Sequence, residues 1–192
     1  MTDCGEMHEL RQGQGQPPPL PLLLRSRYDQ AMQVTHRVSV ERNRLRFAAA
    51  HFATFHGECE PLHGHNYDVI VELEGDLSTD SLVWDFGDLK RQAQVLAEQL
   101  DHKFLLQMDS NLLTIVEQPE SWEVAFKERR YVFPRSDVAP LSVDNTTAER
   151  LAEWFGSALW DHLQAHGDGR VRKLIIGIEE MPGQTGWYTL ER

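Results

Sequence analysis

The feature that most constrains the fold is an alternation of residue types between His65 and Glu74. Tyr67, Val69, Val71 and Leu73 alternate there with Asp68, Ile70, Glu72 and Glu74. Because successive side chains of a strand point to opposite faces of a sheet, this pattern predicts a strand with one buried face, which Gly75 and Asp76 end. Such a strand needs partner strands and a second layer to cover its apolar side.

Two amphipathic helices are predicted to supply that layer. Asp85 is a suitable N-cap for the first, whose apolar residues recur at three- and four-residue spacing from Phe86 to Leu100. The second begins near Thr147 and carries an apolar stripe from Leu151 to Leu159. Gly167 is expected to end it.

Further strands are predicted on both sides of the helices. The first covers about 38–47, with a kink at 41–44, and the last two cover 171–180 and 186–190. The order strand, strand, helix, helix, strand, strand indicates an α+β fold in which a four-stranded antiparallel sheet carries both helices on one face. Residues 107–143 are interpreted as a β-hairpin inserted between the helices, with short strands near 113–116, 122–126 and 131–133.

Composition limits the classes of protein that this chain can represent. Residues 1–33, rich in Gln, Gly and Pro, are predicted to be a flexible extension, and 34–192 a single globular domain. The net charge of -11 argues against nucleic-acid binding. The longest apolar run, 20–24, is too short to span a membrane, and no signal peptide is expected. With only two cysteines, a reduced cytoplasmic setting is favoured over a disulfide framework.

Three histidines form a candidate metal site. His63 and His65 lie two residues apart in an extended segment, so both rings project to the same side. Imidazole suits zinc, and a catalytic zinc typically takes three protein ligands and keeps one position open. His51, which closes the small-residue stretch 47–50, is the best third ligand, with His56 as its competitor.

The motifs around these histidines resemble one known family. Phe47-x-Ala-Ala-His51 followed by Cys59-x-x-x-His63-Gly-His65-Asn-Tyr is similar to the zinc-binding core of the 6-pyruvoyl-tetrahydropterin synthase and 6-carboxytetrahydropterin synthase family. Further matches follow in order, over about 34–106 and 144–192. They are Trp84-Asp-Phe-x-Asp-Leu-Lys90, Leu100-Asp-His-Lys103, Asn145-x-Thr-x-Glu149 and Ile176-x-Ile-x-Glu180. The resemblance implies the tunnelling fold (T-fold) and Zn²⁺ as cofactor.

The resemblance also implies roles for five residues. Cys59, which the residues alone leave open between a base and a small buried side chain, matches the catalytic base. Asp101 and His102 match its proton-relay partners. Glu180, placed by its spacing on the apolar face of a strand, matches the carboxylate that anchors the pterin. Thr147, otherwise a helix cap, matches a pterin contact.

Several activities remain open within this family. The three residues between Cys59 and His63 resemble the branch that converts 7,8-dihydroneopterin triphosphate to 6-carboxytetrahydropterin, acetaldehyde and triphosphate, toward queuosine and other deazapurines. The alternatives are 6-pyruvoyl-tetrahydropterin formation and a folate-type side-chain cleavage that uses a glutamate, for which Glu58 and Glu60 are candidates. A catalytically silent zinc-binding module is the non-enzyme alternative. Family members form trimers or hexamers with active sites between subunits, so a homo-oligomer is expected.

Overall fold

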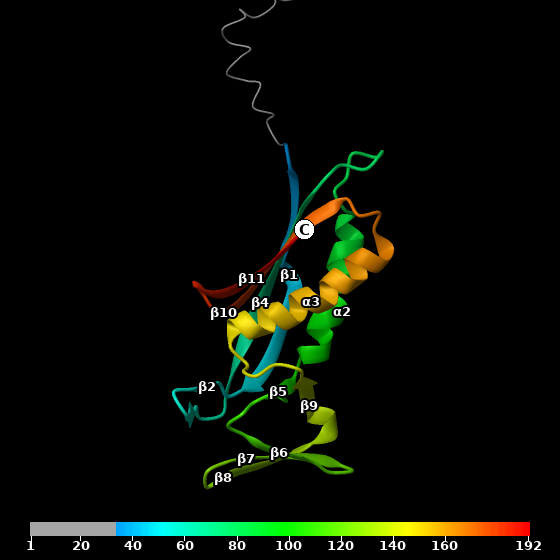
Figure 1. The fold of residues 1–192 in the computed structure, drawn as a ribbon. Helices are drawn as coiled ribbons and strands as arrows, with labels where there is room; N and C mark the ends of the chain where they lie inside the picture. Colours follow the sequence, from blue (N-terminus) through cyan, green and yellow to red (C-terminus); the bar gives the residue numbers. More distant parts are fainter. Residues whose placement is uncertain (1–33) are drawn as a thin grey trace, which may run out of the picture. The chain divides into compact units, whose positions relative to one another are not determined.

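The computed structural model describes residues 34–192, and the predicted extension lies outside them (Figure 1). Two long antiparallel strands, β1 (His36–His51) and β4 (His63–Gly75), form the centre of the sheet. Their register runs from His36 opposite Gly75 to His51 opposite His63, with a shift between Glu41 and Arg46. The predicted kink is therefore a β-bulge within one continuous strand.

Two further strands extend this pair into the predicted antiparallel sheet. β10 (Val171–Met181) pairs with β4, and β11 (Gln184–Glu191) pairs with β10. The register between β10 and β4 ends at Glu179 opposite Asp68. Beyond that pair the two strands are no longer joined, which leaves the side chains that follow free to line a cavity.

Both helices cover the same face of the sheet, as Figure 1 shows. α2 (Phe86–Leu100) is capped by Asp85, whose carboxylate accepts a hydrogen bond from the Asp88 N–H. α3 (Ala148–His166) is capped by Thr147 and ends at Gly167. Their apolar stripes are buried against the alternating face of β4 in one continuous core. The predicted arrangement of helices and antiparallel strands is confirmed.

The sheet has two more strands than the four predicted. β5 (Lys103–Gln107) lies parallel to β1, and β9 (Val138–Leu141) lies parallel to β5, so the order is β11-β10-β4-β1-β5-β9. β5 shows no alternation because both of its faces are buried. Leu105 packs into the core beneath the helices, whereas Phe104 and Leu106 pack into a second core. A short apolar run of this kind gives no periodic signal.

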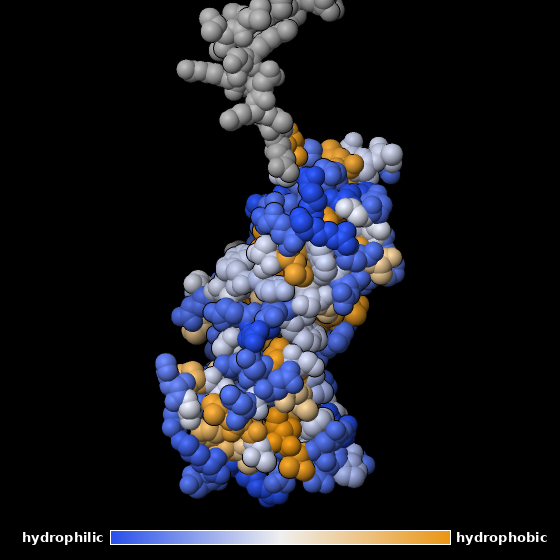
Figure 2. Space-filling model, in the orientation of Figure 1, coloured by the Kyte–Doolittle hydropathy of each residue, from blue (hydrophilic) through white to orange (hydrophobic). Residues whose placement is uncertain are grey.

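The second core belongs to the insertion, whose three strands lie at the three positions predicted for its hairpin. β6 (Thr114–Glu117), β7 (Ser121–Phe126) and β8 (Arg129–Pro134) form an antiparallel sheet, and the short helix η1 (Arg135–Asp137) leads back to β9. The buried faces of β7 and β5 contribute most of this core. Figure 2 shows apolar side chains gathered at the end of the described region that carries these strands.

A small hairpin connects β1 to β4. It consists of β2 (Thr54–Phe55) and β3 (Glu58–Cys59), joined by His56 and Gly57. Both turn residues have positive φ, 52° and 76°. Within residues 34–192, no helix combines the length and apolar character needed to cross a bilayer.

Candidate metal centre and adjoining pockets

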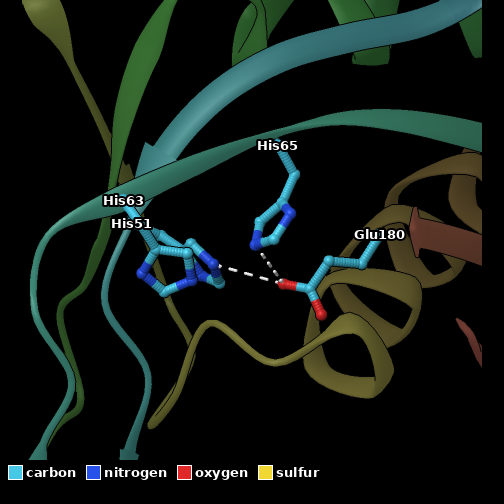
Figure 3. A group of neighbouring side chains, drawn as sticks. All are labelled: His51, His63, His65 and Glu180. Atoms are coloured by element: carbon cyan, nitrogen blue, oxygen red, sulfur yellow. Dashed lines mark ion pairs between the residues drawn. The ribbon is translucent and has the colours of Figure 1, made fainter.

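The three predicted histidine ligands meet where β1 and β4 end. His51 lies directly opposite His63 in the register, and Ala49 lies opposite His65. The His51 ring centroid is 4.6 Å from that of His63 and 5.4 Å from that of His65. Figure 3 shows the three rings converging on one point. The prediction that His51 lies beside the His-Gly-His segment is confirmed.

Gly64 is required by this close strand pairing. A Cβ atom at Gly64 would lie 2.9 Å from the Ala49 carbonyl oxygen, so any side chain there would push the two strands apart. The glycine therefore keeps His63 and His65 close to β1.

Hydrogen bonds to carbonyl groups orient two of the rings. The His51 Nδ1 atom lies 3.0 Å from the Thr146 carbonyl oxygen, and the His63 Nδ1 atom lies 2.8 Å from the Pro61 carbonyl oxygen. Since a carbonyl only accepts, each Nδ1 carries a proton. The neutral rings then present an Nε2 lone pair, which is the form that binds a metal.

Glu180 completes the group. It continues the buried side of β10 after Ile176 and Ile178. Its Oε1 atom lies 3.2 Å from the Nε2 atom of His51 and 3.3 Å from that of His65, as the dashed lines in Figure 3 mark. One ligand atom from each of the four residues lies within 4.8 Å of the others.

This donor set suits a bound cation. Lone pairs and a carboxylate at these distances repel one another unless a proton or a metal ion lies between them. The Nε2 atoms of His51 and His65 are buried and make no hydrogen bond within the described chain. Burial also lowers the pKa of His65, which favours the neutral form that coordinates a metal. The residues therefore fit a zinc-type centre of imidazole nitrogens, with Glu180 as an adjoining carboxylate.

A cavity of about 590 Å³ opens beside the histidines on the helix-covered side. Thr147, Glu149 and Gly186 line it, together with Glu60 and Glu180. Thr147 is also the predicted helix cap, because its hydroxyl accepts from the Arg150 N–H. A Cβ atom at Gly186 would lie 2.4 Å from the Glu149 nitrogen, so only glycine lets β11 approach the start of α3 this closely.

Asp101 and His102 form the predicted pair at the end of α2. The Asp101 carboxylate accepts from the Ala48 N–H at 2.7 Å and lies 2.8 Å from the His102 Nδ1 atom. The Ala48 hydrogen bond is the main cause of the lowered pKa of Asp101. His102 has a φ of 58°, and this left-handed turn brings its ring back toward the carboxylate. His102 lines a second cavity, which it shares with His65 and Glu180 of the same chain.

Cys59 lies apart from both cavities. Its side chain is buried in the insertion core, beside Phe52 and Phe104. Burial raises the pKa of the thiol, although Arg129 acts in the opposite direction. The next residue, Glu60, lines the histidine cavity instead, with its Oε2 atom 4.0 Å from the His63 Nε2 atom. The role of Cys59 as base stays a prediction.

Two residues outside the predicted set lie behind His51: Thr146 contacts its ring, and Gln107 contacts Thr146. Thr146 binds His51, and its hydroxyl also donates to the Gln107 Oε1 atom at 3.2 Å. Both residues are almost fully buried. In the sequence, Thr146 stands out only as a polar residue next to the predicted helix cap Thr147. The one signal for Gln107 was a polar residue at the end of an apolar run.

Comparison with known proteins agrees with this geometry. The model of the family described as 6-pyruvoyl tetrahydropterin synthase matches residues 39–191, which include the whole histidine group. The chain belongs to this family. The expected T-fold follows, since family members of known structure share the architecture.

Relatives within the family carry two different names. A Methanocaldococcus jannaschii protein, provisionally named 6-carboxy-5,6,7,8-tetrahydropterin synthase, is 31% identical over 145 residues, covering 75% of this chain and 89% of its own. An Aquifex aeolicus protein of that name is 32% identical over 124 residues, covering 62% and 69%. The structure of Plasmodium vivax 6-pyruvoyltetrahydropterin synthase superposes with a TM-score of 0.76 at 28% identity, over 83% of this chain and all of that one.

Proposed function

We propose that the chain is a zinc-dependent 6-carboxy-5,6,7,8-tetrahydropterin synthase. It would convert 7,8-dihydroneopterin triphosphate and water to 6-carboxytetrahydropterin, acetaldehyde and triphosphate, on the route to queuosine and other deazapurines. The observation that carries the proposal is the convergence of His51, His63 and His65 beside a cavity that ends at Glu180. The names of the M. jannaschii and A. aeolicus relatives support this branch.

The three histidines would hold the zinc ion through their Nε2 atoms. When bound, zinc would act as a Lewis acid that polarises an oxygen of the substrate side chain. Glu180 would accept paired hydrogen bonds from the guanidine-like edge of the pterin, which satisfies its charge in a half-buried position. Thr147, at the rim of the same cavity, would contact the ring.

Proton transfer would be the task of Asp101, His102 and a base. Because the Asp101 carboxylate lies 2.8 Å from the His102 Nδ1 atom, Nε2 would be the nitrogen left to exchange a proton with a substrate in the second cavity, which His102 lines. Cys59 is the proposed base by family resemblance. A buried thiol with a raised pKa would need a movement of its loop to reach a substrate.

A second activity is favoured by the position of Glu60. Its carboxylate lines the histidine cavity, where Cys59 does not reach. In variants of the P. vivax enzyme, a glutamate named as a catalytic residue is replaced by alanine or cysteine. With Glu60 as base, this chain would form 6-pyruvoyl-tetrahydropterin or cleave the side chain of dihydroneopterin in the folate manner.

One incubation separates these proposals. Zinc-loaded protein is mixed with 7,8-dihydroneopterin triphosphate, and the pterin products are identified by mass. The carboxy branch predicts 6-carboxytetrahydropterin together with acetaldehyde. A pyruvoyl or side-chain-cleaved pterin would support Glu60 as the base instead. Unchanged substrate with a fully occupied zinc site would indicate a silent zinc-binding module.

A further inference from the structure

A line of buried polar groups runs from the start of the insertion to the metal ligand His51. It contains Gln107 at the end of β5, Thr54 in β2, and Asn145 and Thr146 just before α3. Thr54, Gln107 and Thr146 are buried, with Gln107 exposed over 1% and Thr146 over 0% of their surface. Because buried polar groups are costly unless they are paired, an arrangement like this is specific.

The side chain of Asn145 forms hydrogen bonds with backbone groups of Thr54 and Thr146, and these contacts fix its orientation. Its Oδ1 atom accepts from the Thr54 N–H at 2.9 Å and from the Thr146 N–H at 3.0 Å. Its amide nitrogen donates to the Thr54 carbonyl oxygen at 2.7 Å. Backbone groups cannot exchange donor and acceptor roles, so the Asn145 amide has only one satisfactory orientation.

The donor and acceptor roles of Thr54 in turn fix those of Gln107. The Thr54 hydroxyl lies 3.5 Å from the Asn145 Oδ1 atom, a long contact in which only the hydroxyl can donate. The oxygen of the Thr54 hydroxyl therefore accepts from the Gln107 Nε2 atom at 3.0 Å. The other proton of that amide reaches the Ser110 hydroxyl at 3.1 Å. The Gln107 Oε1 atom then faces Thr146 as an acceptor.

The last contacts act on His51. The Thr146 hydroxyl shares its single proton between the Gln107 Oε1 atom, at 3.2 Å, and the Phe52 carbonyl oxygen, at 3.3 Å. Toward the His51 Nδ1 atom, 3.3 Å away, it can only accept. The Thr146 carbonyl oxygen accepts from the same Nδ1 atom. Both contacts require the proton on Nδ1 and leave Nε2 free.

We propose that Gln107 is a positioning residue for the metal centre, which acts through Thr146 to hold His51 in its metal-binding orientation and tautomer. Gln107 touches neither the metal position nor the cavity. Since Gln107 and Ser110 open the insertion, the insertion and the metal ligand share one hydrogen-bond system. The proposal rests on the proposed function only in taking His51 as a zinc ligand.

Zinc affinity of the purified full-length protein is the main test. Loss of an outer hydrogen bond to a ligating histidine typically weakens metal binding about ten- to a hundred-fold. We expect a loss of that size in Gln107→Met and in Thr146→Val, and near-normal affinity in Thr146→Ser, which keeps the hydroxyl. Gln99→Met, on the exposed side of α2, is the matched control. In Gln107→Met/Thr146→Val the losses should not add, because both changes break one system.

The tautomer of His51 provides a readout independent of metal and activity. Nitrogen-15 shifts of the metal-free protein, assigned by comparison with His51→Ala, should show a proton on Nδ1 in the wild type. In Gln107→Met the Thr146 hydroxyl loses its Gln107 acceptor and can donate to Nδ1 in competition with the Thr146 carbonyl, so a mixture of tautomers is expected. Zinc affinity and an Nδ1–H signal that both survive in Gln107→Met would overturn the proposal. A loss of affinity matched by unfolding of the metal-free variant in denaturant would also overturn it, since the role would then be structural. Wild type that binds no zinc would refute the proposed function, while the tautomer would still decide the role of Gln107.

Discussion

Cys59 and Glu60 are adjacent in the chain but face different environments. The Cys59 thiol packs among the apolar side chains of the insertion, while the Glu60 carboxylate lies at the histidine cavity. Arg129, at the start of β8, donates to the carbonyl oxygens of both residues. The Glu60 N–H is in turn held by the Ala53 carbonyl oxygen at 3.0 Å. The insertion thus fixes which of the two side chains reaches the pocket.

The division between the two side chains predicts different effects of their replacement. If Glu60 is the base in the conformation described, Glu60→Gln should reduce turnover of dihydroneopterin triphosphate by about a hundred-fold or more, as loss of a general base does. Cys59→Ala would then cost stability and little activity. Glu58→Gln is the control, because Glu58, two residues earlier in β3, is exposed and pairs with Lys127. The reverse result, with Cys59→Ala inactive, would require the loop to move during catalysis.

Alkylation of Cys59 should depend on pH in a characteristic way. Burial raises the pKa of the thiol, so it stays protonated at neutral pH, where only the thiolate reacts. In a Cys4→Ser background, modification by iodoacetamide should be slow at pH 7. The rate of modification of the folded protein should rise only at a higher pH than the rate for the same chain in denaturant. Equal rates in folded and denatured protein at pH 7 would show an accessible thiolate.

Replacement of single histidines tests the metal ligands. His51→Ala, His63→Ala and His65→Ala should each lose most of the bound zinc, because two imidazoles hold the ion poorly. The control is His56→Asn, which removes the competing ligand while asparagine tolerates the left-handed φ of 52° at this turn. Zinc per chain is measured by elemental analysis after dialysis. Loss of zinc from His56→Asn, with retention in His51→Ala, would show that His56 and not His51 is the third ligand.

Asp101 should stabilise the fold above its pKa and not below it. The Ala48 N–H lowers the pKa of Asp101 relative to about 3.9 for the unfolded chain. A carboxyl with a lowered pKa adds stability above the unfolded value, and that stability is lost as the pH falls through the folded value. In metal-free protein, Asp101→Asn should therefore unfold more easily than wild type at pH 7, and the difference should shrink below about pH 4. A difference that is constant from pH 7 to pH 3 would contradict the ionic role.

The sequence predicts the elements whose patterns are local. The alternation in β4, the caps Asp85 and Thr147, and the i, i+2 histidines each follow from neighbours in the chain, and each is found in the structure. What escapes prediction is set by distant contacts. β5 is buried on both faces and so shows no period, and the link from Gln107 to His51 joins residues that meet only in the folded sheet. No spacing in the sequence encodes such a contact.

Assembly is the last prediction. Among residues 34–192, β11 pairs only with β10 and β9 only with β5, so both edges of the sheet offer unpaired backbone groups. Proteins usually cover long exposed edges, and edge pairing between copies of the chain would do so here. We therefore expect a homo-oligomer, measured by light scattering during gel filtration. A monomer at working concentration would refute this.

A second experiment, in which two inactive variants are mixed, tests whether each active site is formed by two subunits. His63→Ala and His102→Ala are each expected to be inactive. If His63 of one subunit works with His102 of the next, chains of the two variants that are unfolded and reassembled together will form some pockets with both wild-type residues. The mixture should then regain part of the activity. His102 also shares a cavity with His65 and Glu180 of its own chain, an arrangement in which no hybrid pocket is complete. A mixture that stays inactive despite proven subunit exchange would therefore place the catalytic group within one chain.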